Sequence, residues 1–112
     1  MRRWKVGERI LAAKLGCERI PITGRTRSKA PADLMSNWLA VEVKTRKTMP
    51  VFLADAMDQA VRGELYARTK DHRERLPIVV VHADHTHYEN SLVVMRFIDA
   101  DEWFGLGKVS RS

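Results

Sequence analysis

Apolar and polar residues alternate along this chain with periods that change from segment to segment, and the changes predict a series of helices and strands. Apolar residues recur at helical spacing over residues 4–15 and 53–70, and Gly16 is the predicted stop of the first helix. Residues 76–81 form an apolar run too short for a helix, so we expect a central strand buried on both faces. The expected order is a helix at 4–15, a strand at 19–23, a strand ending in a turn near Ser36 and Asn37, a strand at 38–44, a helix at 53–70, strands at 76–81 and 91–97, and a short helix at 100–104.

The segment 38–44 shows the clearest strand pattern, because apolar and other residues alternate through it with a period of two. The alternation predicts that Leu39, Val41 and Val43 share one face and that Glu42 and Lys44 point together from the other. A carboxylate and an ammonium on a strand that otherwise looks core-forming require something to offset their desolvation. A bound cation would do so, and a cross-strand salt bridge of Lys44 with Asp33 or Glu42 is the plainer alternative.

Length and composition predict one domain over residues 1–112, of the α/β class. The longest uncharged run, residues 76–83, is too short to cross a bilayer, and the charged start does not resemble a signal peptide. We therefore expect an intracellular, cytoplasmic protein with no membrane partner and no organic cofactor. The single cysteine, Cys17, rules out an internal disulfide and a cysteine metal cage, and we expect it to be a small buried residue.

The positive charge is concentrated at the start of the chain. The net charge is +6, and residues 1–30 carry nine Lys/Arg against two acidic residues. Residues 24–29 form a basic, hydroxyl-bearing loop suited to a phosphate backbone, or else a solvated loop that aids solubility. The candidate DNA-binding residues are Arg2, Arg3, Lys5, Arg25, Thr26, Arg27, Ser28, Lys29, Arg46 and Lys47.

Asp33 lies just past Pro31 on the strand that precedes Glu42, so its carboxylate can reach the same place. Carboxylate oxygens are the hard ligands that Mg²⁺ or Mn²⁺ prefers. Hydrolysis of a phosphodiester needs an activated water and stabilisation of the charge that develops on phosphate, and divalent cations supply both. We therefore assign Asp33 and Glu42 as candidate metal ligands, with the Val43 main-chain carbonyl as a third.

This arrangement resembles the PD-(D/E)XK nuclease superfamily, and within it the archaeal-type Holliday junction resolvases. The resemblance covers about residues 5 to 97 and rests on Glu8 in the first helix, the basic loop, Asp33, the Glu42-Val43-Lys44 motif and Gln59 in the next helix. It implies a restriction-endonuclease-like αβββαβ core, with a mixed central sheet flanked by helices. It also implies a homodimeric, Mg²⁺-dependent endonuclease that cuts opposed strands of a four-way DNA junction, in which Mn²⁺ substitutes for Mg²⁺.

The resemblance also assigns roles to individual side chains. Lys44 would orient or help to deprotonate the attacking water, and its position beside metal and phosphate suggests the same role. Glu8 would bind a second cation directly or through water, and an ordinary first-turn glutamate favoured by the helix dipole is an equal alternative. The catalytic candidates are thus Glu8, Asp33, Glu42 and Lys44.

Several residues depart from the family pattern or allow other interpretations. Pro31-Ala32-Asp33 replaces the usual Pro-Asp. Gly63 stands four residues after Gln59, where related RecB-type nucleases have Tyr. The resolvases have a functional serine in the loop before the aspartate, and Thr23, Thr26 and Ser28 are the candidates for that position here.

Other residues allow more than one interpretation. The tryptophans Trp4, Trp38 and Trp103 could stack on exposed bases, but core or interface anchors are the commoner use. The stripe of Met57, Val61 and Leu65 suits a core or a dimer contact, and His82, His85 and His87 only weakly suggest zinc. The alternatives are another nuclease of the superfamily, VRR-NUC-like or restriction-type and acting on flaps or duplex, or a non-catalytic DNA-binding protein.

Overall fold

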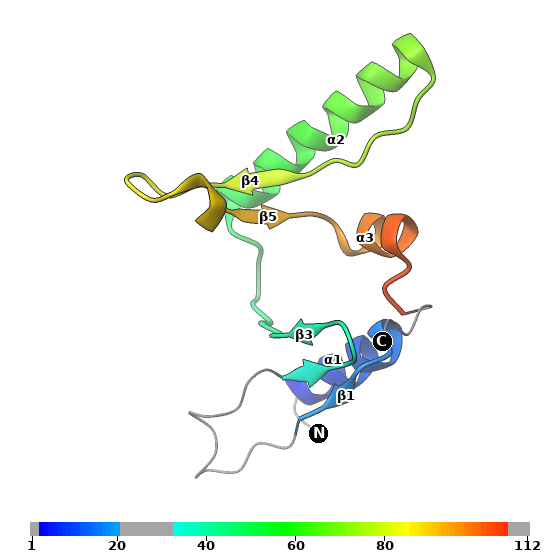
Figure 1. Cartoon of the computed structure of the whole chain (residues 1–112), viewed down its shortest axis with the longest axis vertical. Coiled ribbons are helices and arrows are strands. Elements are labelled where there is room, and N and C mark those ends of the chain that lie inside the picture. The colour runs from blue at the N-terminus through cyan, green and yellow to red at the C-terminus, as the bar shows by residue number, and fades with distance from the viewer. Residues whose placement is uncertain (1–2, 21–32, 108–112) are drawn as a thin grey trace. The chain divides into compact units, whose positions relative to one another are not determined.

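The computed structural model describes residues 3–20 and 33–107, with side chains from residue 7 onward, and shows a mixed α/β protein (Figure 1). Three α-helices and two small antiparallel sheets make up the described part of the chain. The chain divides into two compact units, Met1–Lys47 with Phe104–Ser112, and Thr48–Trp103. No helix within the described ranges is both long and apolar enough to cross a membrane.

The first unit begins with α1 (Arg3–Leu15), whose predicted end at Gly16 is confirmed. Gly16 has a φ of 65°, in the left-handed region that glycine adopts without strain. Its N–H donates to the Ala13 carbonyl at 3.4 Å, and the Cys17 N–H donates to the Ala12 carbonyl at 2.9 Å. These two bonds form a Schellman motif, which satisfies helix carbonyls that would otherwise lack donors.

Three short strands follow, β1 (Glu18–Arg19), β2 (Leu34–Met35) and β3 (Ala40–Val41), and they pair antiparallel in the order β1-β2-β3. The register sets Arg19 opposite Leu34, and Leu34 opposite Val41. The predicted turn near Ser36 is confirmed, because Ser36 exchanges hydrogen bonds with Leu39 across it. The predicted strands 19–23 and 38–44 are longer than the observed ones, and residues 21–23 lie outside the described residues.

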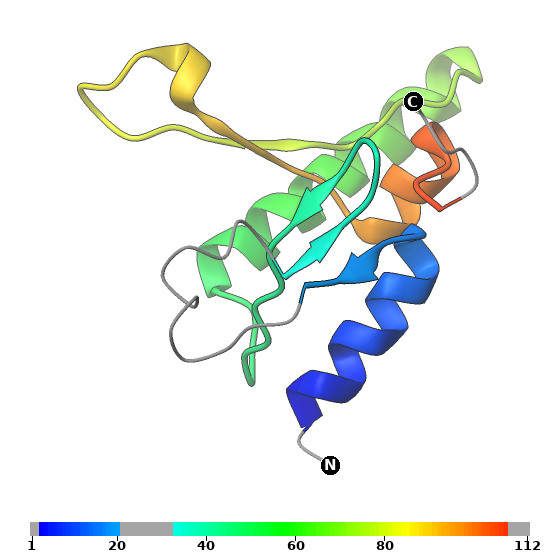
Figure 2. The same ribbon diagram turned by 60° about the horizontal axis from the view of Figure 1, so that its bottom comes forward.

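The core of this unit lies between α1 and one face of the three strands, which run beside the helix (Figure 2). Leu34 is fully buried against Ala12 and Leu15. The apolar side chains predicted to share a face pack on this cluster: Leu39, Val41 and Val43. The alternation over 38–44 therefore correctly predicted which side chains face the core. Of residues 38–44, only Ala40 and Val41 belong to the sheet.

Leu106 and Gly107 bring the later part of the chain back to the end of α1, and Leu106 joins the same core. A Cβ atom at Gly107 would lie 2.1 Å from the Lys14 carbonyl oxygen, so only glycine fits this approach. Nothing in the sequence pattern indicated this contact between residues far apart in the chain.

The second unit contains α2 (Val51–Asp71), β4 (Val79–Val81), the 3₁₀ turn η2 (Tyr88–Asn90) and β5 (Leu92–Val94), followed by α3 (Phe97–Phe104). The predicted helix over 53–70 is confirmed. His72 follows the last residue of α2 with a left-handed backbone that ends the helix, and its N–H still donates to the Arg68 carbonyl. β4 and β5 pair antiparallel as a hairpin, and β4 contacts α2 (Figure 1).

The prediction that 76–81 forms a strand buried on both faces is wrong. Within the described residues β4 pairs only with β5, and Val80 is 56% exposed. A two-stranded hairpin covered by a helix on one side leaves its other face open, and branched apolar residues do not distinguish that position from a central strand. The implied mixed central sheet is likewise not confirmed, because all described strand pairs are antiparallel.

A charged cluster closes the C-terminal end of α2. The Asp71 carboxylate accepts hydrogen bonds from the Arg75 guanidinium and, at 3.0 Å, from the Arg73 N–H. These contacts lower the pKa of Asp71 to about 2, and the hydrogen bond from the Arg75 side chain has the largest effect. A lowered pKa stabilises the fold above the unfolded-state value of 3.8, and this contribution is lost as pH falls towards 2.

We therefore expect the Asp71 carboxyl to titrate with a midpoint near 2 in a ¹³C NMR titration of the folded protein. In Arg75→Gln the largest cause of the shift is removed, so the midpoint should rise towards the ordinary aspartate value. An unchanged midpoint in Arg75→Gln would show that Arg75 does not hold this carboxylate in solution.

Candidate metal and nucleic-acid site

Asp33 is held at the point where the β2-β3 ladder ends. Its carbonyl accepts from the Ile20 N–H, and its N–H donates to the Val41 carbonyl, both at 2.9 Å. Two residues beyond Val41, the Val43 N–H donates to the Asp33 side chain and not to a backbone carbonyl, with the nitrogen 2.7 Å from Oδ2 of Asp33. The carboxylate is thereby fixed beside the segment that carries Glu42 and Lys44.

Glu42 and Lys44 lie on the opposite face of β3 from the core, and their side chains meet. Nζ of Lys44 is 3.2 Å from Oε2 of Glu42, which confirms that the two point the same way. Their side chains are 56% and 72% exposed, so neither is buried in the core as the sequence argument assumed. The desolvation argument for a cation is therefore wrong, since water solvates this pair and an exposed ion pair contributes roughly 0–1 kcal/mol.

Glu8 lies elsewhere in the unit, in an ion pair with Arg19. The Arg19 guanidinium is 3.3 Å from Oε2 of Glu8, and the Glu8 side chain is 13% exposed. Arg19 stands opposite Leu34 in the register and so faces α1, which explains the contact. Sequence reasoning missed Arg19 as the partner of Glu8, because the contact depends on the register of β1 on β2.

The structure thus brings Asp33 next to the Glu42-Val43-Lys44 segment and does not add Glu8 to that group. Among the described residues, no three His, Cys, Asp or Glu side chains come close enough to hold a metal ion together. Asp33, Glu42 and the Val43 carbonyl remain a set of oxygen donors of the kind that Mg²⁺ accepts with water completing its coordination. The chemistry of this donor set fits a divalent cation.

The histidines considered for zinc, His82, His85 and His87, form no metal-binding group among the described residues. His82 stacks on Tyr88 with ring centroids 4.2 Å apart, and its Nδ1 is 2.8 Å from the Ser91 hydroxyl. Since His82 and Ser91 directly extend the β4-β5 register, this is a cross-strand contact that stabilises the hairpin.

Most of the candidate DNA-binding residues cannot be placed. Arg46 and Lys47 are exposed and follow Lys44 after one intervening residue, so positive charge continues along the chain past the Glu42-Lys44 ion pair. Arg3 and Lys5 belong to the α1 backbone, but their side chains lie outside the described residues. The remaining candidates also lie outside them: Arg2, Arg25, Thr26, Arg27, Ser28 and Lys29, together with Thr23.

Comparisons with known proteins add no relative: no family model matches the chain, and searches of curated proteins and of solved structures give no significant match.

Proposed function

We propose that this protein is a structure-selective, divalent-metal-dependent DNA endonuclease of the PD-(D/E)XK type, most specifically a Holliday junction resolvase. The observation that carries the proposal is the 2.7 Å bond from the Val43 N–H to the Asp33 carboxylate, which fixes that carboxylate beside Glu42 and Lys44. The order α1, β1 to β3, α2, β4 is the element order that the proposed restriction-endonuclease-like αβββαβ core requires.

In this proposal Asp33, Glu42 and the Val43 carbonyl would hold Mg²⁺ or Mn²⁺. The bound cation would lower the pKa of a water and offset the charge that develops on phosphate. Val43 has two roles, because its N–H orients Asp33 while its carbonyl offers a further oxygen. Asp33 retains a carboxylate oxygen beyond the one that accepts the Val43 N–H, so the anchoring bond does not exhaust its capacity as a ligand.

Lys44 would act on the water and the phosphate rather than on the fold. Its side chain is 72% exposed and forms an ion pair with Glu42, which an exposed side chain exchanges at little cost for an incoming phosphate. Its ammonium would then orient the attacking water and offset the negative charge of the phosphate. Glu8, engaged by Arg19, is better suited in this structure to positioning α1 on β1 than to binding a cation.

The charge distribution supports a nucleic-acid substrate. The net charge is +6, and the exposed Arg46 and Lys47 follow within three residues of Lys44 in the chain. Such cations hold the phosphate backbone and make binding depend strongly on salt. Symmetric cleavage of opposed strands needs two sites, so the proposal includes a homodimer, and a DNA substrate with a lone cysteine favours a cytoplasmic location.

The proposal is tested with labelled four-way junction, flap and linear duplex, each incubated with the protein in Mg²⁺ or in EDTA. We expect paired symmetric nicks in the junction that disappear in EDTA. Equal cutting of flap or duplex would favour another nuclease of the superfamily. Junction binding without metal-dependent cutting would identify a non-catalytic DNA-binding protein, in which the exposed Glu42-Lys44 pair is only a surface salt bridge.

A further inference from the structure

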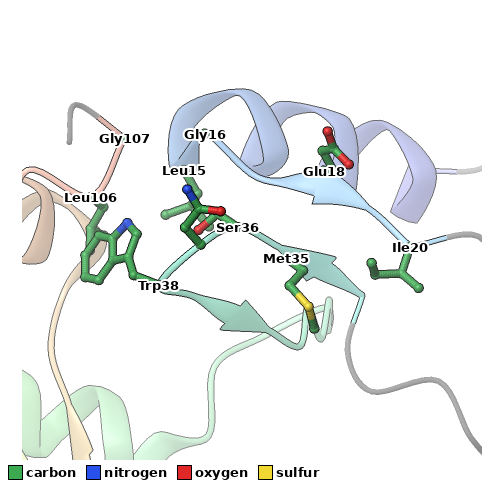
Figure 3. A pocket seen from close by; sticks show the side chains of 10 residues that line it. Leu15, Gly16, Glu18, Ile20, Met35, Ser36, Trp38, Leu106 and Gly107 are labelled. Atoms are coloured by element: carbon green, nitrogen blue, oxygen red, sulfur yellow. The ribbon is translucent and has the colours of Figure 1, made fainter. Parts of the chain in front are cut away.

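The first unit contains a pocket of about 450 Å³, lined by residues from the end of α1, from β1 and β2, from the turn after β2 and from the segment 106–107 (Figure 3). This volume lies within the range of small-molecule sites. Its walls combine apolar side chains with a few polar ones, chiefly Ile20, Met35, Trp38 and Leu106 with Glu18 and Ser36. The indole of Trp38 lies beside Leu106 in Figure 3, so a flat aromatic surface forms part of the wall.

Part of the pocket wall, at Met35 and its register partner Glu18, lies on the same face of the sheet as the Glu42-Lys44 pair. Leu34 and Val41 face α1, so Met35 and its register partner Ala40 face away from the helix. Glu42 and Lys44 follow Ala40 at two-residue intervals and share that side. Met35 is two residues beyond Asp33, which is about 7 Å along a strand. A DNA strand held at Asp33 would therefore pass the pocket within one or two nucleotides.

The residues that line the pocket favour one part of a nucleotide, the base, over the phosphate. Glu18 is an exposed carboxylate on the pocket wall and repels a phosphate. It accepts hydrogen bonds from an amino group, as carboxylates do from the exocyclic amines of bases. Trp38 and Met35 offer stacking and dispersion contacts to a flat ring. A neutral, planar group with amino donors suits all of these residues.

We propose that this pocket receives an unpaired nucleobase from the branch point of the DNA, one or two nucleotides from the phosphate that is cut. The proposal rests on the proposed nuclease function and supplies a source for its selectivity. Taking a base out of a duplex stack costs a few kcal/mol, and that cost is least where the base is already unpaired. A branched DNA therefore fills the pocket more readily than an intact duplex does.

The test measures binding by fluorescence anisotropy in EDTA, so that cleavage does not interfere. The probes are a four-way junction and matched junctions with an abasic site at each branch-point nucleotide in turn. For the wild type we expect one abasic position to weaken binding by about tenfold, the range of one stacked base. Trp38→Leu should bind the intact and abasic junctions equally, whereas Trp103→Leu, a matched change in the second unit, should behave as wild type.

A second variant keeps the test decisive if Trp38→Leu does not fold. Glu18 is exposed, so Glu18→Met should fold, and it should lose the preference for cytosine or adenine over thymine at the sensitive position. Glu89→Gln removes another exposed acid, which does not line the pocket, and should keep that preference.

The outcomes separate the two proposals. Equal affinity of the wild type for all junctions, with cutting of the intact one in Mg²⁺, overturns the pocket and leaves the nuclease. Absence of both junction binding and cutting overturns the nuclease and the pocket with it.

Discussion

Asp33→Asn is expected to lose Mg²⁺-dependent junction cleavage by at least about a hundredfold while it stays folded. The variant is chosen from the structure, because an asparagine oxygen can still accept the 2.7 Å hydrogen bond from the Val43 N–H. The substitution removes the negative charge that would hold the cation, but it keeps the hydrogen bond from the Val43 N–H to residue 33. Asp33→Ala would remove both and confuse catalysis with stability.

The measurement is the single-turnover cleavage rate of a labelled four-way junction, with binding followed separately in EDTA. Asp58→Asn is the matched control, since Asp58 is an exposed aspartate of α2 and its loss changes the net charge equally. Glu42→Gln should be impaired like Asp33→Asn, because it also neutralises a proposed ligand. If Asp33→Asn cut at the wild-type rate, Asp33 would be a purely structural carboxylate and the proposed metal site would be wrong.

Leu34→Ala is expected to destabilise the protein by about 3 kcal/mol. Leu34 is fully buried, and it is the side chain through which β2 contacts Ala12 and Leu15 of α1. The first unit has few other buried apolar residues among those described, so the cavity has little around it that can repack. The loss is a large part of the 5–15 kcal/mol typical of a folded domain.

Urea denaturation followed by tryptophan fluorescence and far-UV circular dichroism measures this effect as a shift in midpoint at constant slope. Met35→Ala is the matched control, because Met35 is the next residue of the same strand and faces away from the core, and we expect it to cost about 1 kcal/mol or less. A cost below about 1 kcal/mol for Leu34→Ala would contradict the packing of β2 on α1.

The local patterns of the sequence predicted elements well where the signal lies within a few residues. Helical spacing located α1 and α2 to within a few residues, and Gly16 marked the end of α1 because a left-handed residue is needed there. The same patterns failed on sheet position. The run that contains Val80 reads as a buried strand, and its exposure depends on how many strands surround it, which is not a local property.

The candidate site shows the same division. Period-two alternation was enough to predict that Glu42 and Lys44 share a face, since it depends only on the geometry of one strand. Their exposure was not predictable, because it depends on what packs above that face. The pairing of Glu8 with Arg19 needed the register of β1 on β2, which no motif in the chain encodes.

By itself, the sequence determined α1 and α2 to within a few residues, the turn at Ser36, the two faces of residues 38–44 and the excess of positive charge, because each follows from neighbouring residues or from composition. The last helix was predicted three residues too short at its start, since α3 begins at Phe97 and not at Ala100. Only the tertiary structure decided that the Asp33 carboxylate caps the Val43 N–H, that Gly107 rests against Lys14, and that Trp38 lines a pocket with Leu106. These contacts join segments distant in the chain. Their geometry depends on how the strands pair and pack on α1, which local patterning leaves open.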